Sequence, residues 1–178
     1  MLLFNVGKTG YFVLTLTIAI LLIVTFFFFS GNKMEIKSPA FKNNGKIPSK
    51  YTCDSENASP PLEFSNVPKD AKSLVLIMDD PDAPSGMWVH WVVFNIPPKT
   101  SLISENEEPN GIQGMTSFGS EGYGGPCPPD GEHRYFFKIY ALGKILDLSE
   151  GATKKEIELA MKGHIIEQAE MVGRYEKV

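Results

Sequence analysis

Four side chains that can donate or accept protons stand beside loops rich in proline or glycine: Asp80, His90, His133 and Tyr135. Imidazole and phenol groups are hydrogen-bond donors, and a carboxylate can orient a histidine or, when protonated, donate to a ligand itself. With the backbone amides of a glycine-rich loop, such groups can hold one compact anion without lysine or arginine. These residue types therefore indicate an anion pocket, if the chain brings them together.

Two other interpretations of the same residues stay open. Asp80 or Asp82, with His90 or His133, could form the acid–base pair of a hydrolase or hold a metal ion with a bound water. Alternatively, the polar strand ends are satisfied internally and the domain has a purely structural role. The sequence contains no serine elbow and no HExxH motif, so it offers no evident nucleophile or metal site. A binding function without catalysis and without a cofactor is therefore favoured.

Asp80 and His90 belong to two apolar segments joined by an acidic turn, residues 79–86, which Pro81 and Pro84 stiffen. Side chains alternate across a strand, so Asp80 shares a face with Leu74, Leu76 and Met78. The same rule places His90 with Trp88, Val92 and Phe94. An ionised carboxylate at the end of an apolar row must be hydrogen-bonded or paired, which predicts a polar pocket at the strand end. A hairpin whose aspartates bond nearby backbone amides would give the same pattern.

A glycine- and proline-rich stretch, residues 118–131, leads directly into an alternating segment, residues 133–142. The alternation predicts a strand with His133, Tyr135, Phe137 and Ile139 on one face. Free backbone N–H groups of the glycines would then form one wall of the pocket.

The end of the chain is predicted to form a helix. Residues 153–156 have a capping-box pattern, apolar residues recur at helical spacing from Ile157 to Val172, and Gly173 would end the helix. His164 would lie on its apolar face as a hydrogen-bonded structural residue. Many strands with glycine and proline turns, together with one packed helix, are typical of a mostly antiparallel β domain.

Length and charge limit the possible partners. A chain of 178 residues has room for one globular domain. Its net charge of −4 and the lack of a Lys and Arg cluster argue against nucleic-acid binding. Any anion must therefore be held by local groups.

An uncharged, mostly apolar segment, residues 11–29, lies near the N-terminus. As a helix with a rise of about 1.5 Å per residue it would span roughly 28 Å, close to the hydrocarbon thickness of a bilayer. We expect residues 1–33 to form a single-pass membrane anchor and residues 34–178 the globular domain; a cleaved signal segment and a buried core helix are the alternatives. Lysines flank the segment on both sides and leave the orientation open, and we prefer a domain outside the cytoplasm.

Two cysteines, Cys53 and Cys127, suit such a compartment if they pair. A disulfide between them would stabilise the fold by roughly 4 kcal/mol on a chain-entropy estimate. Two free buried thiols are the alternative.

Several separated motifs resemble the phosphatidylethanolamine-binding protein family, in particular its bacterial and archaeal, Raf-kinase-inhibitor-like branch. In chain order they are YTCD (51–54), SPPL (59–62), DPDAPSG (80–86), WVHW (88–91), GYGGPCPPDGEHRY (122–135) and KGHIIEQAEMVGRY (162–175). The resemblance covers residues 36–175. It implies a Greek-key β-sandwich of two antiparallel sheets, with a small cavity that binds phosphate-like headgroups and other anions.

By position in these motifs, the family's pocket residues correspond to Asp80, His90 and His133, surrounded by Asp82, Tyr135, Gly125 and Pro126. Val89 stands where the eukaryotic branch has another histidine, so the eukaryotic kinase-binding role is not carried over directly. The expected function is that of a membrane-tethered binding module for a phosphate-like anion or lipid headgroup. Its occupied surface would inhibit or modulate a protein partner such as a protease or a kinase.

Overall fold

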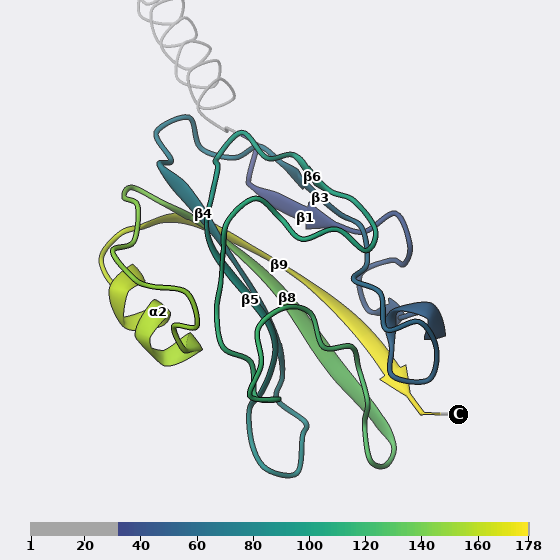
Figure 1. Cartoon of the computed structure of the whole chain (residues 1–178). Helices are drawn as coiled ribbons and strands as arrows, with labels where there is room; N and C mark the ends of the chain where they lie inside the picture. Colours follow the sequence, from purple (N-terminus) through teal and green to yellow (C-terminus); the bar gives the residue numbers. More distant parts are fainter. Residues whose placement is uncertain (1–31, 178) are drawn as a thin grey trace, which may run out of the picture. The chain divides into compact units, whose positions relative to one another are not determined.

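Strands are the main regular elements of residues 32–177, the part of the chain that the computed structural model describes (Figure 1). The strands are β1 (Glu35–Lys37), β2 (Gly45–Lys46), β3 (Leu62–Ser65), β4 (Ser73–Asp80), β5 (Trp88–Ile96), β6 (Leu102–Ile103), β7 (Ile112–Gln113), β8 (Glu132–Leu142) and β9 (Ile165–Glu176). A short 3-10 helix, η1 (Ser49–Tyr51), and the helix α2 (Lys154–Met161) complete them. The predicted anchor, residues 11–29, lies outside the described residues, and no helix within 32–177 is long and apolar enough to cross a membrane.

The strands form two sheets, so the expected mostly-β architecture is confirmed. The larger sheet has the order β2-β9-β8-β4-β5-β7, and the smaller has the order β1-β3-β6. All neighbouring strands run antiparallel except β2 and β9, which are parallel, so the larger sheet is mixed rather than purely antiparallel. The smaller sheet covers one face of the larger sheet, and α2 covers the other (Figure 1).

Strand β4 lies in the middle of this arrangement, and all its residues are buried. Leu74, Leu76 and Met78 pack in the core between the two sheets, whereas Val75 and Ile77 pack in the core under α2. A strand with a layer on each face needs apolar side chains on both, which explains its continuous apolar sequence.

Strand β5 departs from the predicted alternation. Met78 pairs with Trp91 and Asp79 pairs with Val89, so His90 has no partner on β4 and forms a β-bulge. A bulge inserts one residue and changes which face the following side chains occupy. Trp91 therefore packs between the sheets, while Val92 and Phe94 pack under α2. The prediction that His90 shares a face with Val92 and Phe94 was wrong.

The prediction of a long helix near the C-terminus was also wrong, because the helix ends at Met161. The capping box of Thr153 and Glu156 is present, but Gly163 adopts a φ of +78°, which a helix cannot continue through. Residues 165–176 form β9, which pairs along its length with β8. Because α2 precedes this strand, the helix is not the last element of the fold.

His164 lies in the turn between α2 and β9 and is exposed, so its predicted structural role was wrong. Its backbone N–H donates to the carbonyl of Met161 at 2.9 Å.

A buried carboxylate fastens α2 to the sheet. Asp79 is fully buried and accepts hydrogen bonds from Lys138 Nζ at 2.8 and 3.0 Å and from Lys154 Nζ at 2.5 Å. Lys154 is the first residue of α2, and Lys138 lies on β8. Since a buried charge is tolerated only when paired, these two lysines account for Asp79 on the face of the sheet opposite Asp80.

Candidate functional site

A cavity of about 320 Å³ lies where β4, β5 and β8 meet their loops. Four buried polar residues line it: Asp80, His90, His133 and Tyr135, each less than a tenth exposed. The remaining wall is largely apolar and consists of Ala83, Pro84, Ser85, Trp88, Phe118, Cys127, Pro128 and Pro129. The structure thus brings together the four side chains that the sequence indicated, from three separate strands.

Asp80 and His133 form a buried pair at the adjoining ends of β4 and β8. The distance from Asp80 Oδ2 to His133 Nδ1 is 2.8 Å, and both side chains are less than a tenth exposed. Asp80 Oδ1 accepts a second bond, from the backbone N–H of Asp82, at 2.8 Å. A carboxylate only accepts hydrogen bonds, so Nδ1 of His133 carries the proton and Nε2 is left for another partner.

His90 is oriented by the glycine-rich loop. Its Nδ1 lies 2.7 Å from the carbonyl oxygen of Gly124, and the Gly124 N–H donates back to the His90 carbonyl at 2.9 Å. The ring packs edge-on against Phe118 and Tyr135, with centroid distances of 5.4 and 5.2 Å. Burial among these groups lowers the pKa of His90, so the imidazole is neutral at pH 7. A neutral ring that donates from Nδ1 presents an acceptor at Nε2.

Tyr135 supplies a donor that nothing in residues 32–177 satisfies. Its side chain is fully buried, and no acceptor for its hydroxyl proton is found there; the nearby backbone N–H of Cys127, which lowers the pKa of Tyr135, can only donate to the hydroxyl oxygen. Burial, and secondarily the charge of Asp80, raises the pKa of Tyr135 well above its ordinary value, so the hydroxyl keeps its proton. A buried polar group without a partner is costly, and its presence in a cavity wall indicates that a ligand or water completes it.

Asp82 does not line the cavity. Its Oδ2 accepts from Arg134 Nε at 2.8 Å and from the Arg134 backbone N–H at 3.0 Å, and its Oδ1 accepts from Arg134 Nη2 at 2.7 Å. These bonds lower the pKa of Asp82 to about 2. Of the two carboxylates considered for a hydrolase, only Asp80 therefore lies in the cavity wall.

Gly125 and Pro126 lie behind the cavity wall rather than on it. The Gly125 N–H donates to Asn57 Oδ1 at 2.8 Å, and the Pro126 carbonyl accepts from the Cys53 N–H at 3.1 Å. A Cβ on Gly125 would lie 2.4 Å from Asn57 Oδ1, so the approach of these two loops requires glycine. The predicted wall of free glycine N–H groups was wrong for Gly124 and Gly125, because both amides have partners within the protein.

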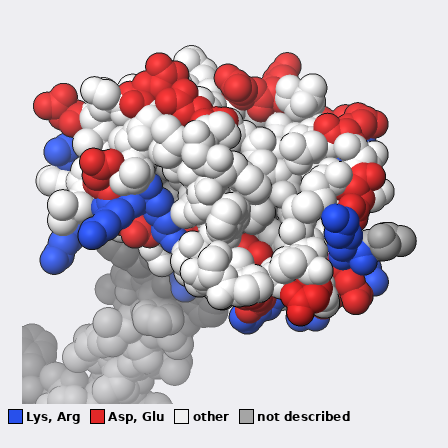
Figure 2. Space-filling view, turned by 60° about the horizontal axis from the view of Figure 1, so that its bottom comes forward, with Lys and Arg blue, Asp and Glu red and all other residues white. Residues whose placement is uncertain are grey.

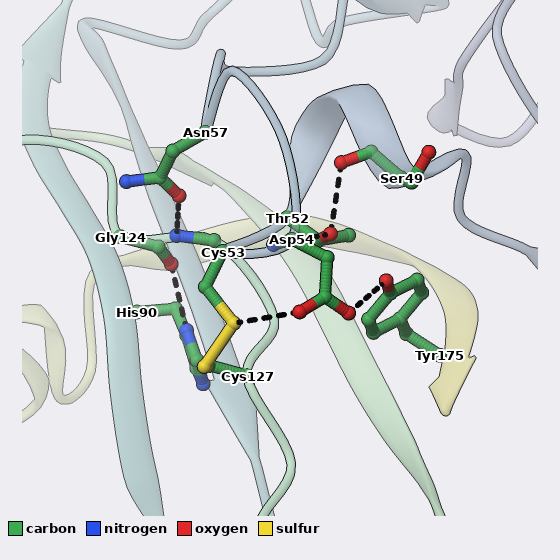
Figure 3. Close-up of a disulfide and its surroundings, with 10 residues drawn as sticks. Ser49, Thr52, Cys53, Asp54, Asn57, His90, Gly124, Cys127 and Tyr175 are labelled. Atoms are coloured by element: carbon green, nitrogen blue, oxygen red, sulfur yellow. Dashed lines mark hydrogen bonds between the residues drawn. A yellow bond between two sulfur atoms is a disulfide. The ribbon is translucent and has the colours of Figure 1, made fainter. Parts of the chain in front are cut away.

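A disulfide joins Cys53 to Cys127, which decides between the two cysteine states that the sequence left open (Figure 3). Cys127 lines the cavity, whereas Cys53 follows η1. In Figure 3 the bond lies next to Asp54, which accepts from the Tyr175 hydroxyl at 2.5 Å. The disulfide therefore ties one wall of the cavity to a segment 74 residues away in sequence.

The apolar part of the wall was largely missed by the sequence reasoning. Trp88 stands two residues before His90 on the same strand, and the prolines belong to the segments already noted, so a strand-and-loop argument could have included them. Phe118 begins the glycine- and proline-rich stretch 118–131, but only the backbone of that stretch was expected at the pocket; its side chain reaches the site by packing on Trp88 at a centroid distance of 5.4 Å.

Figure 1 shows the β4–β5 turn and the loop before β8 together at its lower end. Figure 2 turns this end toward the viewer, and the middle of the face is mostly uncharged. Acidic and basic side chains lie mainly around its margin. A ligand at this face would therefore meet the few polar groups inside the cavity and not a broad charged surface.

Comparisons with known proteins agree with this architecture. The profile of the family described as phosphatidylethanolamine-binding protein matches residues 37–176. The UPF0098 protein of Methanothermobacter thermautotrophicus is 52% identical over 150 residues, which cover 81% of this chain and 99% of that protein. The UPF0098 protein of Aquifex aeolicus is 49% identical over 166 residues, covering 88% and 97% of the two chains.

Two solved structures are similar as well. A phosphatidylethanolamine-binding protein homologue of Chlamydia trachomatis has 47% sequence identity and a TM-score of 0.81, with 83% of this chain and 99% of that chain covered. Escherichia coli YbcL, described as a member of the mammalian family, has 29% identity and a TM-score of 0.76, with 82% and 99% covered. The profile match, the close relatives and the shared fold together establish that the chain belongs to the phosphatidylethanolamine-binding protein family.

Proposed function

We propose that the cavity binds a phosphate-like anion, either free or as a phosphorylated headgroup, and that the protein acts by binding and not by catalysis. The observation that carries this proposal is the convergence of His90, His133 and the unpartnered Tyr135 hydroxyl on one cavity. None of these groups is an activated nucleophile. All three can exchange hydrogen bonds with the oxygens of a compact anion.

The two imidazoles suit a phosphate that shares its proton with them. Nδ1 of His90 and Nδ1 of His133 are occupied by Gly124 and Asp80, so each ring offers Nε2 to the ligand. A neutral Nε2 accepts from the hydroxyl of a singly charged phosphate, and a protonated Nε2 donates to a doubly charged one. Both arrangements contain the same number of protons, so affinity should fall above pH 7 as that proton is lost.

Asp80 opposes anion binding through its charge, and His133 offsets this effect. The carboxylate lies 2.8 Å from the imidazole, so protonation of His133 gives a pair without net charge. An anion then meets the imidazolium edge rather than an isolated carboxylate. This arrangement favours an anion that brings or shares a proton over one that remains fully ionised.

The apolar wall suits the remainder of a larger ligand. Trp88, Phe118 and Pro129 stand around the polar groups, and Phe118 is 48% exposed. An ester substituent on the phosphate would contact these side chains while its oxygens meet the histidines. The proposal therefore includes phosphorylated headgroups as well as inorganic phosphate.

Membrane tethering and control of a partner belong to the same proposal. The support for an anchor is the apolar segment 11–29, and the support for an extracytoplasmic domain is the Cys53–Cys127 disulfide. Phe118, about half exposed, offers contacts for a protein partner such as a protease or kinase at the mouth of the cavity. Carbonate extraction of membranes tests the anchor, because an integral protein remains in the pellet.

Calorimetric titration with inorganic phosphate and with phosphoethanolamine tests the binding site. The variant His90→Asn should lose about tenfold or more in affinity, since it removes one ring nitrogen from the ligand. His164→Asn is the matched control, because His164 is exposed in a turn and does not line the cavity. Equal affinities for the wild type and His90→Asn would overturn the proposal.

A further inference from the structure

The large sheet has a second end, opposite the cavity. The cavity lies where β4 ends and β8 begins, at Asp80 and His133. At the other end β4 begins, β5 and β8 end, and β9 begins. Four segments of the chain form this basic end of the domain: residues 66–72, 97–101, 143–146 and 162–166. Strand β8 has 11 residues, so roughly 30 Å separate the basic end from the cavity.

Backbone hydrogen bonds and strand pairing hold these segments side by side. The Lys72 N–H donates to the Leu142 carbonyl at 2.7 Å, and the Gly143 N–H donates to the His164 carbonyl at 2.9 Å. Strand β5, which ends directly before the second segment, pairs with the first residues of β4. The basic end is therefore one continuous surface of the domain.

Positive charge gathers at this end, although the chain as a whole has a net charge of −4. The four segments contain five lysines: Lys69, Lys72, Lys99, Lys144 and Lys162. Their carboxylate is Asp70, and Asp147 and Glu167 directly follow two of the segments, so lysines outnumber carboxylates by five to three. None of the five lysines forms an ion pair within residues 32–177. Such a surface attracts anionic lipid headgroups.

Three isoleucines stand exposed among these lysines. Ile145 is 66% exposed, Ile165 is 42% exposed and Ile166 is 39% exposed. Ile165 pairs with Leu142, three residues before Ile145, so the isoleucines come from adjoining strand ends. Apolar side chains gain by entering the headgroup region of a bilayer, and lysines beside them keep their charged ends in water. A nucleic acid would satisfy the lysines but leave the isoleucines in water, so the pattern fits a lipid surface.

The first described residues of the domain lie at the same end. The Met34 N–H donates to Glu167 Oε1 at 2.8 Å, and Glu167 directly follows Ile166. The apolar segment 11–29 ends five residues before Met34, and five residues extend at most about 17 Å. Given the membrane anchor proposed above, on which this inference rests, Met34 lies in the headgroup layer or a short way beyond it.

We propose that the basic end of the anchored protein rests on the lipid surface and that the cavity opens away from that bilayer. The headgroups of the protein's own bilayer are then roughly 30 Å from the histidines of the cavity. The ligand is therefore a phosphorylated compound dissolved in the aqueous phase. This deepens the proposed function, because it selects the dissolved compound over a headgroup of the same membrane.

Paramagnetic broadening by a lipid that carries a gadolinium chelate tests the orientation. The full chain, labelled with ¹⁵N, is placed in nanodiscs of phosphatidylcholine and phosphatidylglycerol that contain this lipid. The amides of the basic end should broaden, whereas those of Asp80, His90 and His133 should stay sharp. Broadening that is strongest at the cavity, uniform over the domain or absent would overturn the proposal.

Charge substitution tests whether the lysines hold this orientation. The variant Lys69→Gln/Lys72→Gln/Lys162→Gln should lose most of the broadening at the basic end, because it removes the attraction to phosphatidylglycerol. Its matched control is Lys42→Gln/Lys46→Gln/Lys177→Gln, which changes three exposed lysines outside the basic end. The control should keep the wild-type pattern. Equal broadening in the two variants would overturn the role of the basic end.

The source of the ligand is tested in the same nanodiscs. Replacement of phosphatidylcholine by phosphatidylethanolamine should leave the indole resonance of Trp88, which lines the cavity, in place, whereas dissolved phosphoethanolamine should shift it. A shift caused by the lipid would overturn the aqueous source.

Two outcomes separate this inference from the proposals on which it rests. Carbonate extraction that releases the chain from the membrane would refute the anchor and this inference with it. A Trp88 resonance that does not move with dissolved phosphoethanolamine would refute the anion cavity and the ligand source, while the broadening pattern would still report the orientation. A chain that stays inserted but broadens at the cavity would refute this inference alone.

Discussion

The carboxylate of Asp80 and the imidazole of His133 lie 2.8 Å apart, and both are almost completely buried. The two residues are 53 positions apart in sequence and meet because β4 and β8 are antiparallel neighbours. This contact fixes the tautomer of His133 and keeps a charge from standing alone inside the protein. It is therefore the structural basis of the proposed anion site.

A double-mutant cycle tests how strongly the two residues depend on each other. His133→Asn should lower the free energy of unfolding by about 3 kcal/mol, because it leaves the Asp80 carboxylate buried without its partner. Asp80→Asn/His133→Asn should cost less than the sum of the two single substitutions, with a coupling energy of about 2 kcal/mol. Urea unfolding at pH 7 measures all four proteins, and additive effects would show that the pair contributes nothing of its own.

The burial of His90 predicts a loss of stability on mild acidification. Its pKa is lowered in the folded protein, so below about pH 6.5 the unfolded chain binds a proton that the folded chain does not. The free energy of unfolding should therefore fall as the pH decreases from 6.5 toward the lowered pKa. In His90→Gln the free energy of unfolding should no longer show this decrease with pH, whereas in His164→Gln, a change at an exposed histidine, the decrease should remain. Identical pH profiles for the wild type and both variants would contradict the account.

Asp82 predicts a second transition, at lower pH. Hydrogen bonds from Arg134 lower its pKa to about 2, so its contribution is complete above pH 4 and is lost as the pH falls from about 4 to 2. Arg134 is half exposed, so the contribution is about 1 kcal/mol and not the full value of the pKa shift. Arg134→Gln should remove this acid-dependent step in thermal unfolding. A step of the same size in the variant would assign it to other carboxylates.

The Cys53–Cys127 disulfide should affect both stability and ligand binding. It closes a loop of 74 residues, and its removal in Cys53→Ser/Cys127→Ser should cost about 4 kcal/mol in the free energy of unfolding. Phosphate affinity should also fall, because Cys127 forms part of the cavity wall. Adding a reductant should reproduce both effects in the wild type and change nothing in the variant. A reductant that leaves wild-type stability and affinity unchanged would show that the bond is dispensable.

The sequence was sufficient to predict the strands that hold the site. Strands β4 and β8 have long apolar or alternating patterns, and the positions of Asp80, His133 and Tyr135 follow directly from that alternation. The bulge at His90 was not predictable in this way, because it depends on how β5 pairs with β4. The rotation it produces moved Val92 and Phe94 to the opposite core.

Other differences arose from partners far away in sequence. Asp82 was predicted to line the pocket, but its hydrogen bonds to Arg134 hold it outside the cavity. The amides of Gly124 and Gly125 were predicted to be free, but they donate to the His90 carbonyl and to Asn57 Oδ1. The segment after Gly163 contains apolar residues at both helical and strand spacing. Pairing with β8 selects the strand, with Met171 and Tyr175 in the core, and no local signal showed this preference.

The most direct test of the proposed function is a ¹H–¹⁵N NMR titration of the protein with inorganic phosphate and phosphoethanolamine at pH 6.5. The account predicts saturable shifts of Asp80, His90, His133 and Tyr135 and of the loop amides at residues 122–125 and 127, with little change elsewhere. Substitution of His90 by asparagine should abolish saturation at millimolar ligand. Shifts that are absent, or that spread over the surface without saturation, would contradict an anion site in this cavity.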